Sequence, residues 1–145
     1  MKREFRISLA AVFIGGLVDV ISTNLLVNFL FAYVVIDKGF PVDKIAEIFP
    51  QISNIIHSSS ILFAVQTVFE LLGSILGGYV AARIAGEDEV PNAIAASIVM
   101  VAIGIFEIIT GPVESIPLAG FGIVITPWFY RLGALVRVQQ KTSSK

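Results

Sequence analysis

The chain has 145 residues, of which 56% are hydrophobic and only 14% charged, and its formal net charge is -1. Soluble domains are about 45–50% apolar and about 25% charged, so this composition is typical of a membrane protein. The near-neutral charge gives no basic surface for nucleic acid. The chain has no cysteine and one histidine, which excludes disulfides, thiol chemistry and a multi-histidine metal site. We expect no metal and no cofactor. Because the sequence also shows no nucleophile–base pair, we expect no catalytic residues and not an enzyme, and a membrane enzyme ranks third behind the two functions given below.

The first long apolar run, residues 7–36, carries one charge, Asp19. A helix of this length spans about 45 Å, more than a hydrocarbon core of about 30 Å, so it tilts or projects. It is also too long for a cleaved signal sequence. Its small and polar residues form two stripes, one of Gly15, Gly16, Asp19, Ser22 and Thr23 and one, nearly opposite, of Asn24 and Asn28. This pattern predicts protein neighbours on both sides, within the chain or in an oligomer.

Residues 41–57 alternate isoleucine and phenylalanine with charged and amide side chains at helical spacing. This predicts an amphipathic helix, broken at Pro50, that lies in the membrane interface between the first and second spanning helices. A lid over a pore or a docking surface for a partner are the alternatives. His57 precedes Ser58, Ser59 and Ser60, which we interpret as ordinary helix caps rather than parts of a catalytic site.

The second spanning helix, about residues 61–85, has a bulky side and a smooth side. Small residues on a membrane helix let another helix approach closely. The third helix, about residues 91–110, repeats this arrangement, and the short connection after Gly86 predicts an antiparallel hairpin. The residues that we expect to mediate helix packing are Gly73, Gly77, Gly78, Ala81 and Gly104.

The fourth helix, about residues 116–136, contains Pro127, which should kink it, and three glycines that should weaken it, Gly120, Gly122 and Gly133. Trp128, Tyr130 and Arg131 are typical of a belt at the membrane surface. The sequence leaves the helix end open between Tyr130 and Val138. We expect residues 1–145 to form a single integral membrane domain: an all-α, polytopic bundle of four transmembrane helices.

The basic residues predict the orientation of the chain. Four crossings place both termini and the 86–90 loop on one side of the membrane. That side holds eight of the ten Lys and Arg residues, namely Lys2, Arg3, Arg6, Arg83, Arg131, Arg137, Lys141 and Lys145. Because loops on the cytoplasmic side are enriched in Lys and Arg, we expect a multi-pass protein of the cell membrane with both termini in the cytoplasm.

Three carboxyl groups fall within the predicted spans: Asp19, Glu70 and Glu107. Glu70 lies 16 residues before Gly86 and Glu107 lies 16 residues after Pro91, so both lie about 24 Å from the shared loop. Asp19 lies about one helical turn lower. If the three converge, either they take up protons or a cation binds among them. The alternatives are protonated acids that hydrogen-bond across helices, to Ser74, Thr67, Asn24 or Asn28, or a wet crevice without a ligand.

The segment GGYVAARIAG, which ends a helix before a short charged turn and NAIAAS, resembles small uncharacterised four-helix membrane proteins of bacteria and archaea. The resemblance covers residue 77 to about residue 97 and implies no known activity. The small multidrug-resistance transporters are similar in size and helix count, but their membrane-embedded glutamate is in the first helix. Here the first helix has Asp19, and the glutamates are in the second and third helices.

Two functions fit these features. The first is a small cation- or proton-coupled transporter or channel that uses Asp19, Glu70 and Glu107. Because four helices enclose little interior, its path would form between copies in a homo-oligomer. The second is an accessory or scaffold subunit in the lipid bilayer that binds a partner membrane protein through its small-residue faces.

Overall fold

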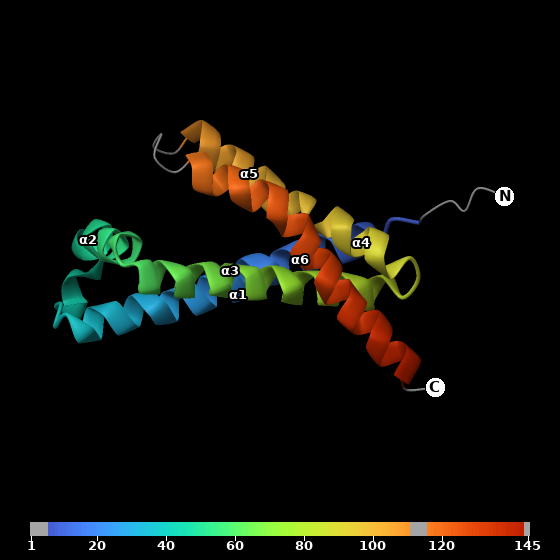
Figure 1. Ribbon diagram of the computed structural model, residues 1–145, viewed down its shortest axis with the longest axis horizontal. Coiled ribbons are helices and arrows are strands. Elements are labelled where there is room, and N and C mark those ends of the chain that lie inside the picture. The colour runs from blue at the N-terminus through green and yellow to red at the C-terminus, as the bar shows by residue number, and fades with distance from the viewer. Residues whose placement is uncertain (1–5, 111–115, 144–145) are drawn as a thin grey trace. The chain divides into compact units, whose positions relative to one another are not determined.

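The computed structural model describes residues 6–110 and 116–143, apart from the side chains of Glu107 and residues 116–119, and every element in these ranges is helical (Figure 1). In chain order the elements are α1 (Leu9–Asp37), the short 3-10 helix η1 (Val42–Lys44), α2 (Ile45–Ser58), α3 (Ser60–Ala85), α4 (Glu89–Ala96), α5 (Ile98–Thr110) and α6 (Ile116–Ser143). The predicted all-α class is confirmed for the described residues. The predicted outer turn falls largely on residues 111–115, which lie outside them.

Four stretches are long and apolar enough to cross a membrane: Leu9–Asp37, Ser60–Ala85, Glu89–Thr110 and Gly120–Ser143. Large apolar side chains on these helices are exposed, for example Phe29 at 71% and Ile109 at 75%. The buried positions between helices are instead held by small residues such as Ala81 and Ala96. This distribution is the reverse of a soluble bundle and matches helices that face lipid. The architecture is that of a small multi-pass membrane protein.

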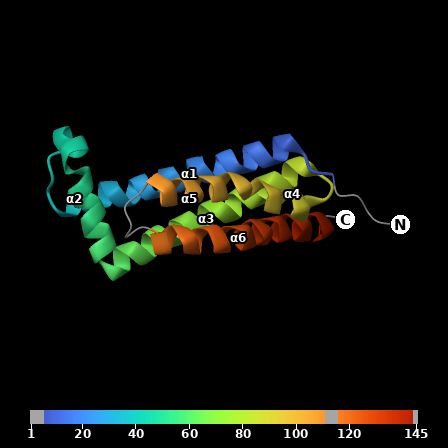
Figure 2. The same cartoon turned by 90° about the horizontal axis from the view of Figure 1, so that it is seen from above.

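The chain forms two compact units. One comprises Met1–Ser22 and Gly73–Lys145, and the other comprises Thr23–Leu72. Two helices contribute to both units, because α1 and α3 each run without interruption through the boundary. In the first unit α6 packs against α4 and α5, and α5 lies beside α6 in both views (Figure 1 and Figure 2).

Hydrogen bonds tie three parts of the first unit together at one end. The side-chain amide of Asn92 donates to the carbonyl of Arg6 (2.9 Å), and its oxygen accepts from the Ser8 N–H (2.7 Å). Lys141 donates to the Gly86 carbonyl (2.8 Å) and pairs with Glu89 (3.0 Å). The start of α1, the α3–α4 loop and the end of α6 therefore lie together. The loop turns through left-handed backbone at Gly86 (φ 67°) and Asp88 (φ 48°).

The third predicted helix is interrupted. It begins at Glu89, before the expected Pro91, and is divided at Ser97 into α4 and α5. The Ser97 hydroxyl donates to the Ile94 carbonyl (2.7 Å), and its N–H is shared between the Ala93 and Ile94 carbonyls. A buried serine that bonds the backbone of the preceding turn competes with the regular helical ladder, which explains the irregularity.

The fourth helix is longer than the predicted 116–136, because α6 continues through Pro127 to Ser143. Contacts with the rest of the first unit hold its last turns. The Tyr79 hydroxyl donates to Gln140 (2.9 Å), and Lys141 reaches the α3–α4 loop. The sequence shows a polar end to this helix but not the partners that keep it helical.

In the second unit the apolar side of α2 packs against α1 and α3. Ile48, Ile52 and Ile56 are buried in one cluster with Leu30, Val34 and Val35 of α1, and Leu62, Val65 and Phe69 of α3 cover its edge. The amphipathic pattern thus has a partner within the chain. Whether α2 also lies in the membrane interface stays a prediction.

The predicted break at Pro50 is wrong, because α2 is helical through Pro50 and ends at Ser58. Proline removes one backbone donor from the helix, and the apolar cluster on the opposite face compensates for that loss. The chain bends instead at Ser59, whose backbone is extended (φ −95°, ψ 112°). The Ser59 hydroxyl accepts from the Leu62 N–H (3.4 Å), the capping role expected for this serine run.

Candidate functional site: the buried Asp19 side chain

Asp19 is a carboxyl group with 0% exposure in the middle of an apolar helix. It belongs to the first unit, where α1 crosses α3. The crossing is close because glycines face each other. A Cβ built on Gly15 would lie 2.6 Å from the Ala81 Cβ and 2.9 Å from the Gly77 carbonyl oxygen, closer than real side-chain contacts. Two helix backbones that touch in this way exclude bulky side chains and lipid tails from Asp19.

Ser74 of α3 supplies a hydrogen bond to this carboxyl. Its hydroxyl donates to Asp19 Oδ2 over 3.0 Å, and the serine is itself only 5% exposed. The sequence analysis named Ser74 among the polar residues that could receive a membrane-embedded acid. A buried polar group that lacks a partner costs free energy, so this bond helps to fix α1 against α3.

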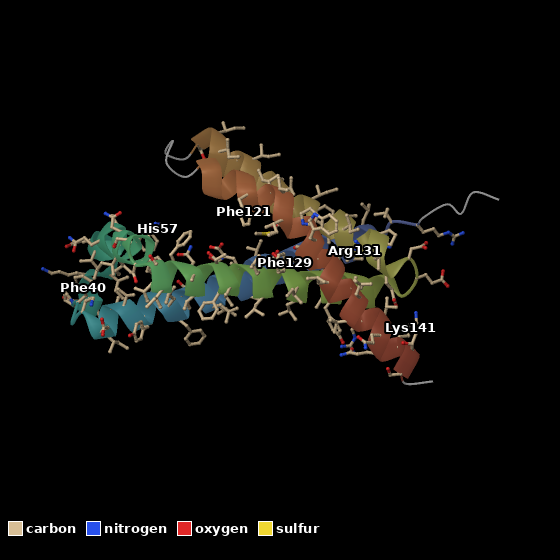
Figure 3. The ribbon with its side chains drawn as sticks, in the orientation of Figure 1. Phe40, His57, Phe121, Phe129, Arg131 and Lys141 are labelled. Carbon is tan, nitrogen blue, oxygen red and sulfur yellow. The ribbon has the colours of Figure 1, made fainter. Side chains whose placement is uncertain are left out.

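Tyr130 of α6 is the third side chain at this point and was not predicted there. The tyrosine is completely buried and is the largest fully buried side chain among the described residues. Figure 3 labels Phe129 and Arg131, which precede and follow it in the sequence of α6. A Cβ built on Gly77 would lie 2.9 Å from the Asp19 Cβ and 3.0 Å from the Tyr130 hydroxyl oxygen. The carboxyl-bearing residue and the phenol therefore lie against the same glycine.

The predicted aromatic belt needs correction. Trp128 is 59% exposed and Arg131 is exposed, with the guanidinium carbon 5.7 Å from the centre of the Trp128 ring. These two residues can lie at a membrane surface, but Tyr130 points into the protein. Gly133 and Ala134, three and four positions later, are also buried, and they share its helix face. That spacing of small residues beside Tyr130 is the signal that could have identified it.

Glycines also allow α6 to approach α3. A Cβ on Gly133 would overlap the carbonyl oxygen of Ile75, and one on Gly78 would overlap the backbone of Tyr130. Gly133 therefore also has a packing role, which the sequence analysis did not predict. Gly120 and Gly122, by contrast, have open space around them.

The remaining residues predicted to mediate packing are also placed. Gly73, Gly77, Gly78 and Ala81 are buried along α3, and Gly104 is half-buried on α5. On α3 these buried positions continue through Ser74 and Ala82, so one side of the helix end is covered by protein. Bulky Leu72 and Leu76 on the same helix are exposed.

The other two predicted carboxyls lie outside the described part of the first unit. Glu70 belongs to the second unit, is half-buried, and accepts a hydrogen bond from the Gln66 amide (2.9 Å). The side chain of Glu107 lies outside the described residues. Asn24 and Asn28 are exposed, and the Thr67 hydroxyl bonds its own helix at the Phe63 carbonyl (3.0 Å). The convergence of three acids stays a prediction.

The chemistry available at Asp19 follows from its neighbours. Ser74 and Tyr130 contribute neutral hydroxyl groups. The basic residues nearest to Asp19 in the chain, Arg6 and Lys38, lie before and after α1, and on α3 the nearest to Ser74 is Arg83, more than two turns away. Among the described side chains, no three His, Cys, Asp or Glu lie together as metal ligands would. One carboxyl with hydroxyl neighbours in a low-dielectric environment is suited to hold a proton rather than a dehydrated divalent ion.

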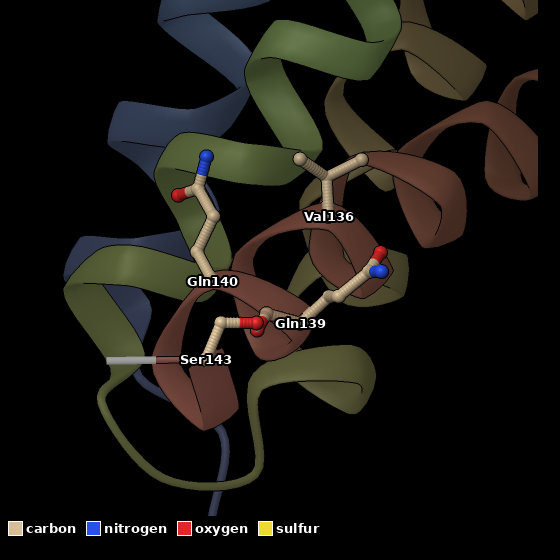
Figure 4. Close-up of a pocket in the computed structure, with 4 residues that line it drawn as sticks. All are labelled: Val136, Gln139, Gln140 and Ser143. Atoms are coloured by element: carbon tan, nitrogen blue, oxygen red, sulfur yellow. The ribbon is translucent and has the colours of Figure 1, made fainter. Parts of the chain in front are cut away.

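Two other features of the described residues, a hollow on α6 and the side chain of His57, offer fewer groups for binding or proton transfer. An open hollow of about 400 Å³ is lined by Val136, Gln139, Gln140 and Ser143, all from α6 and none with an acid or base (Figure 4). His57 is exposed on α2, with its Nδ1 3.5 Å from the Ser53 hydroxyl and its ring edge-on to Phe63.

Comparison of the chain with protein-family models, with curated proteins and with solved structures gives no significant match. The case for a function therefore rests on the geometry around Asp19 and on the membrane architecture.

Proposed function

We propose that the chain is a small proton-coupled membrane transporter or channel in which Asp19 carries the proton. The observation that supports this most is the complete burial of Asp19 at the crossing of α1 with α3, beside Ser74. An ionised carboxyl is strongly disfavoured in such a place, so the group is neutral when the site is closed and ionises when water reaches it. Such a group links proton binding to a change in helix packing.

The packing around Asp19 supports the same proposal. The α1–α3 contact consists of glycine backbone and alanine methyl groups, with Ser74 as its polar member. Small smooth surfaces allow two helices to shift without interlocked side chains to rearrange. Proton release would leave a charged Asp19 carboxylate in this dry contact, and would therefore favour a looser contact between α1 and α3. Cation coupling through Asp19, Glu70 and Glu107 together remains the broader form of the proposal.

The alternative of a scaffold subunit requires small-residue faces that are free to bind a partner helix. Gly77, Gly78 and Ala81 are instead buried within the chain, so the proposal favours transport. We further propose that the protein lies in the cell membrane with both termini cytoplasmic, and that the transport path forms between copies of the chain. Hydrogen bonds hold the start of α1, the 86–92 segment and the end of α6 together. This arrangement agrees with an even number of membrane crossings.

The test is proton flux into liposomes that contain purified protein, measured with an internal pH dye under an imposed pH gradient. Asp19→Asn should reduce flux to the level of empty liposomes, because the amide keeps an acceptor for Ser74 but cannot release a proton. Asp43→Asn, at an exposed acid in η1, is the matched control and should retain flux. Glu70→Gln and Glu107→Gln test whether the other acids take part.

Wild-type flux that persists in folded Asp19→Asn protein would refute the assigned role of Asp19. Absence of flux from well-folded wild-type protein would refute the transport proposal itself and favour the partner-binding alternative.

A further inference from the structure

The hydroxyl group of Tyr130 is an unsatisfied polar atom inside the protein. The side chain has 0% exposure, and its oxygen has no hydrogen-bond partner of ordinary geometry. Buried hydroxyls nearly always have a partner, so an orphan calls for an explanation. Phenylalanine would fill nearly the same space without that unfavourable burial.

The orphan hydroxyl lies beside Asp19. Both groups lie against Gly77, and the Asp19 carboxyl acts on the Tyr130 hydroxyl both as a nearby charge and as a hydrogen-bond acceptor whose position falls short of ordinary hydrogen-bond geometry. The position of Tyr130 is fixed by its own backbone, which packs directly on Gly78 and leaves no room for a side chain there. The phenol therefore approaches the carboxyl on a helix contact that is backbone against backbone.

We propose that Tyr130 is a positioning residue of the Asp19 site. While Asp19 is protonated, the Tyr130 hydroxyl makes no hydrogen bond of ordinary geometry. When Asp19 loses its proton, the hydroxyl donates a hydrogen bond to the carboxylate. The proton leaves the Asp19 carboxyl for water, while the phenol keeps its own proton and only reorients. This proposal rests on the proposed function, in which Asp19 changes protonation state. It makes α6, through Tyr130, the helix that responds to that change.

Among the described residues, few charged groups lie near this point. On α1 the charged group is Asp19 itself, and on α3 the nearby residues are Ser74 and Gly77. Farther along α3, Glu70 precedes Ser74 by one turn and accepts from Gln66. On α6 the neighbouring charge is Arg131, which is exposed and stacked on Trp128. The α4–α5 region meets this end of α1 through Ala96 and Val99, which are apolar. Glu107 on α5 has its side chain outside the described residues.

The experiment measures thermal unfolding of the full chain in lipid nanodiscs from pH 5 to pH 9.5, for wild type, Tyr130→Phe, Asp19→Asn and the double variant. At low pH, Tyr130→Phe should unfold at the wild-type temperature or above it, because an unsatisfied hydroxyl has been removed. At high pH it should unfold at least about 3 °C below wild type, since the ionised carboxylate has lost a charge-assisted hydrogen bond. In the Asp19→Asn background the Tyr130→Phe effect should be the same at every pH.

Tyr79→Phe is the matched control. It removes a hydroxyl of α3 that donates to Gln140, and its effect should not change with pH in this way. A Tyr130→Phe effect that is constant across the pH range, or that persists unchanged with Asp19→Asn, would overturn the proposal. Thermal unfolding and proton flux are independent measurements. If the Tyr130→Phe effect on unfolding depends on pH but the wild-type protein shows no flux, the transport proposal alone is refuted. Flux lost in Asp19→Asn with a constant Tyr130→Phe effect refutes the role of Tyr130 alone.

Discussion

Substitution of Gly133 by alanine should destabilise the protein although it adds only one methyl group. Gly133 lies where α6 crosses α3, and a Cβ at this position would overlap the Ile75 carbonyl oxygen and lie 2.7 Å from the Tyr79 backbone nitrogen. Both neighbours are backbone atoms of a helix, so no side chain can move aside. Relief requires α6 to move away from α3 by more than about 1 Å, since nonbonded carbon contacts are favourable near 3.5–4.0 Å.

Two opposing contributions set the magnitude. Alanine is favoured over glycine inside a helix by about 1 kcal/mol. Overpacking of a tight contact typically costs about 1–3 kcal/mol, and a clash with backbone belongs at the upper end or beyond. We therefore expect a net loss of about 2 kcal/mol or more, which corresponds to a fall in the unfolding midpoint of about 4–8 °C for a chain of this size. The movement of α6 away from α3 also breaks the contact between the Tyr130 backbone and Gly78.

The matched controls are Gly120→Ala and Gly122→Ala on the same helix, where nothing lies within 4 Å of the added atom. These variants keep the propensity gain without the clash and should be as stable as wild type or more so. The assay is thermal unfolding in nanodiscs followed by fluorescence of Trp128, the single tryptophan, which is also on α6. Gly133→Ala with the same midpoint as Gly120→Ala would refute the backbone contact between α6 and α3.

Two further predictions concern the ends of the chain. Asn92→Ala should lower the free energy of unfolding by about 1–3 kcal/mol, because Asn92 is 1% exposed and its side chain satisfies the Ser8 N–H and the Arg6 carbonyl; thermal unfolding checks this, and an unchanged midpoint would contradict it. Since the natural chain has no cysteine, single-cysteine variants at exposed Thr142 and Lys38 report topology directly. With both termini cytoplasmic, an impermeant thiol reagent should label Lys38→Cys but not Thr142→Cys in intact cells, and the opposite pattern would reverse the proposed orientation.

Several tertiary features show where reasoning from sequence stops. Asp19 and Ser74 are 55 positions apart, and only the crossing of α1 and α3 brings their side chains to 3.0 Å. The sequence identified both residues on smooth helix sides but could not select this pair over the alternatives. Tyr130 was misplaced for a related reason: tyrosine near tryptophan and arginine is typical of a membrane surface, and its burial depends on how α6 is rotated against α3.

Local irregularities were missed in the same way. Proline at position 50 and serine at position 97 have clear intrinsic effects on a helix, but the outcome depends on packing. The cluster around Ile52 holds α2 helical through Pro50, whereas Ser97 is buried and turns its hydroxyl to the preceding carbonyl. Propensity is a weak effect that tertiary contacts can override or expose.

The sequence by itself determined that this is an all-α chain with four helices able to cross a bilayer. The bilayer imposes that result locally, since each span must satisfy its own backbone and carry an apolar surface of sufficient length. The segregation of small from bulky residues on α3 was also readable, because it depends only on helical periodicity. The tertiary structure alone decided that Asp19 is sealed beside Ser74 and Tyr130, and that Gly133 rather than Gly120 is a point of contact. Those outcomes depend on where rigid helices cross and how each is rotated about its axis, which no single helix encodes.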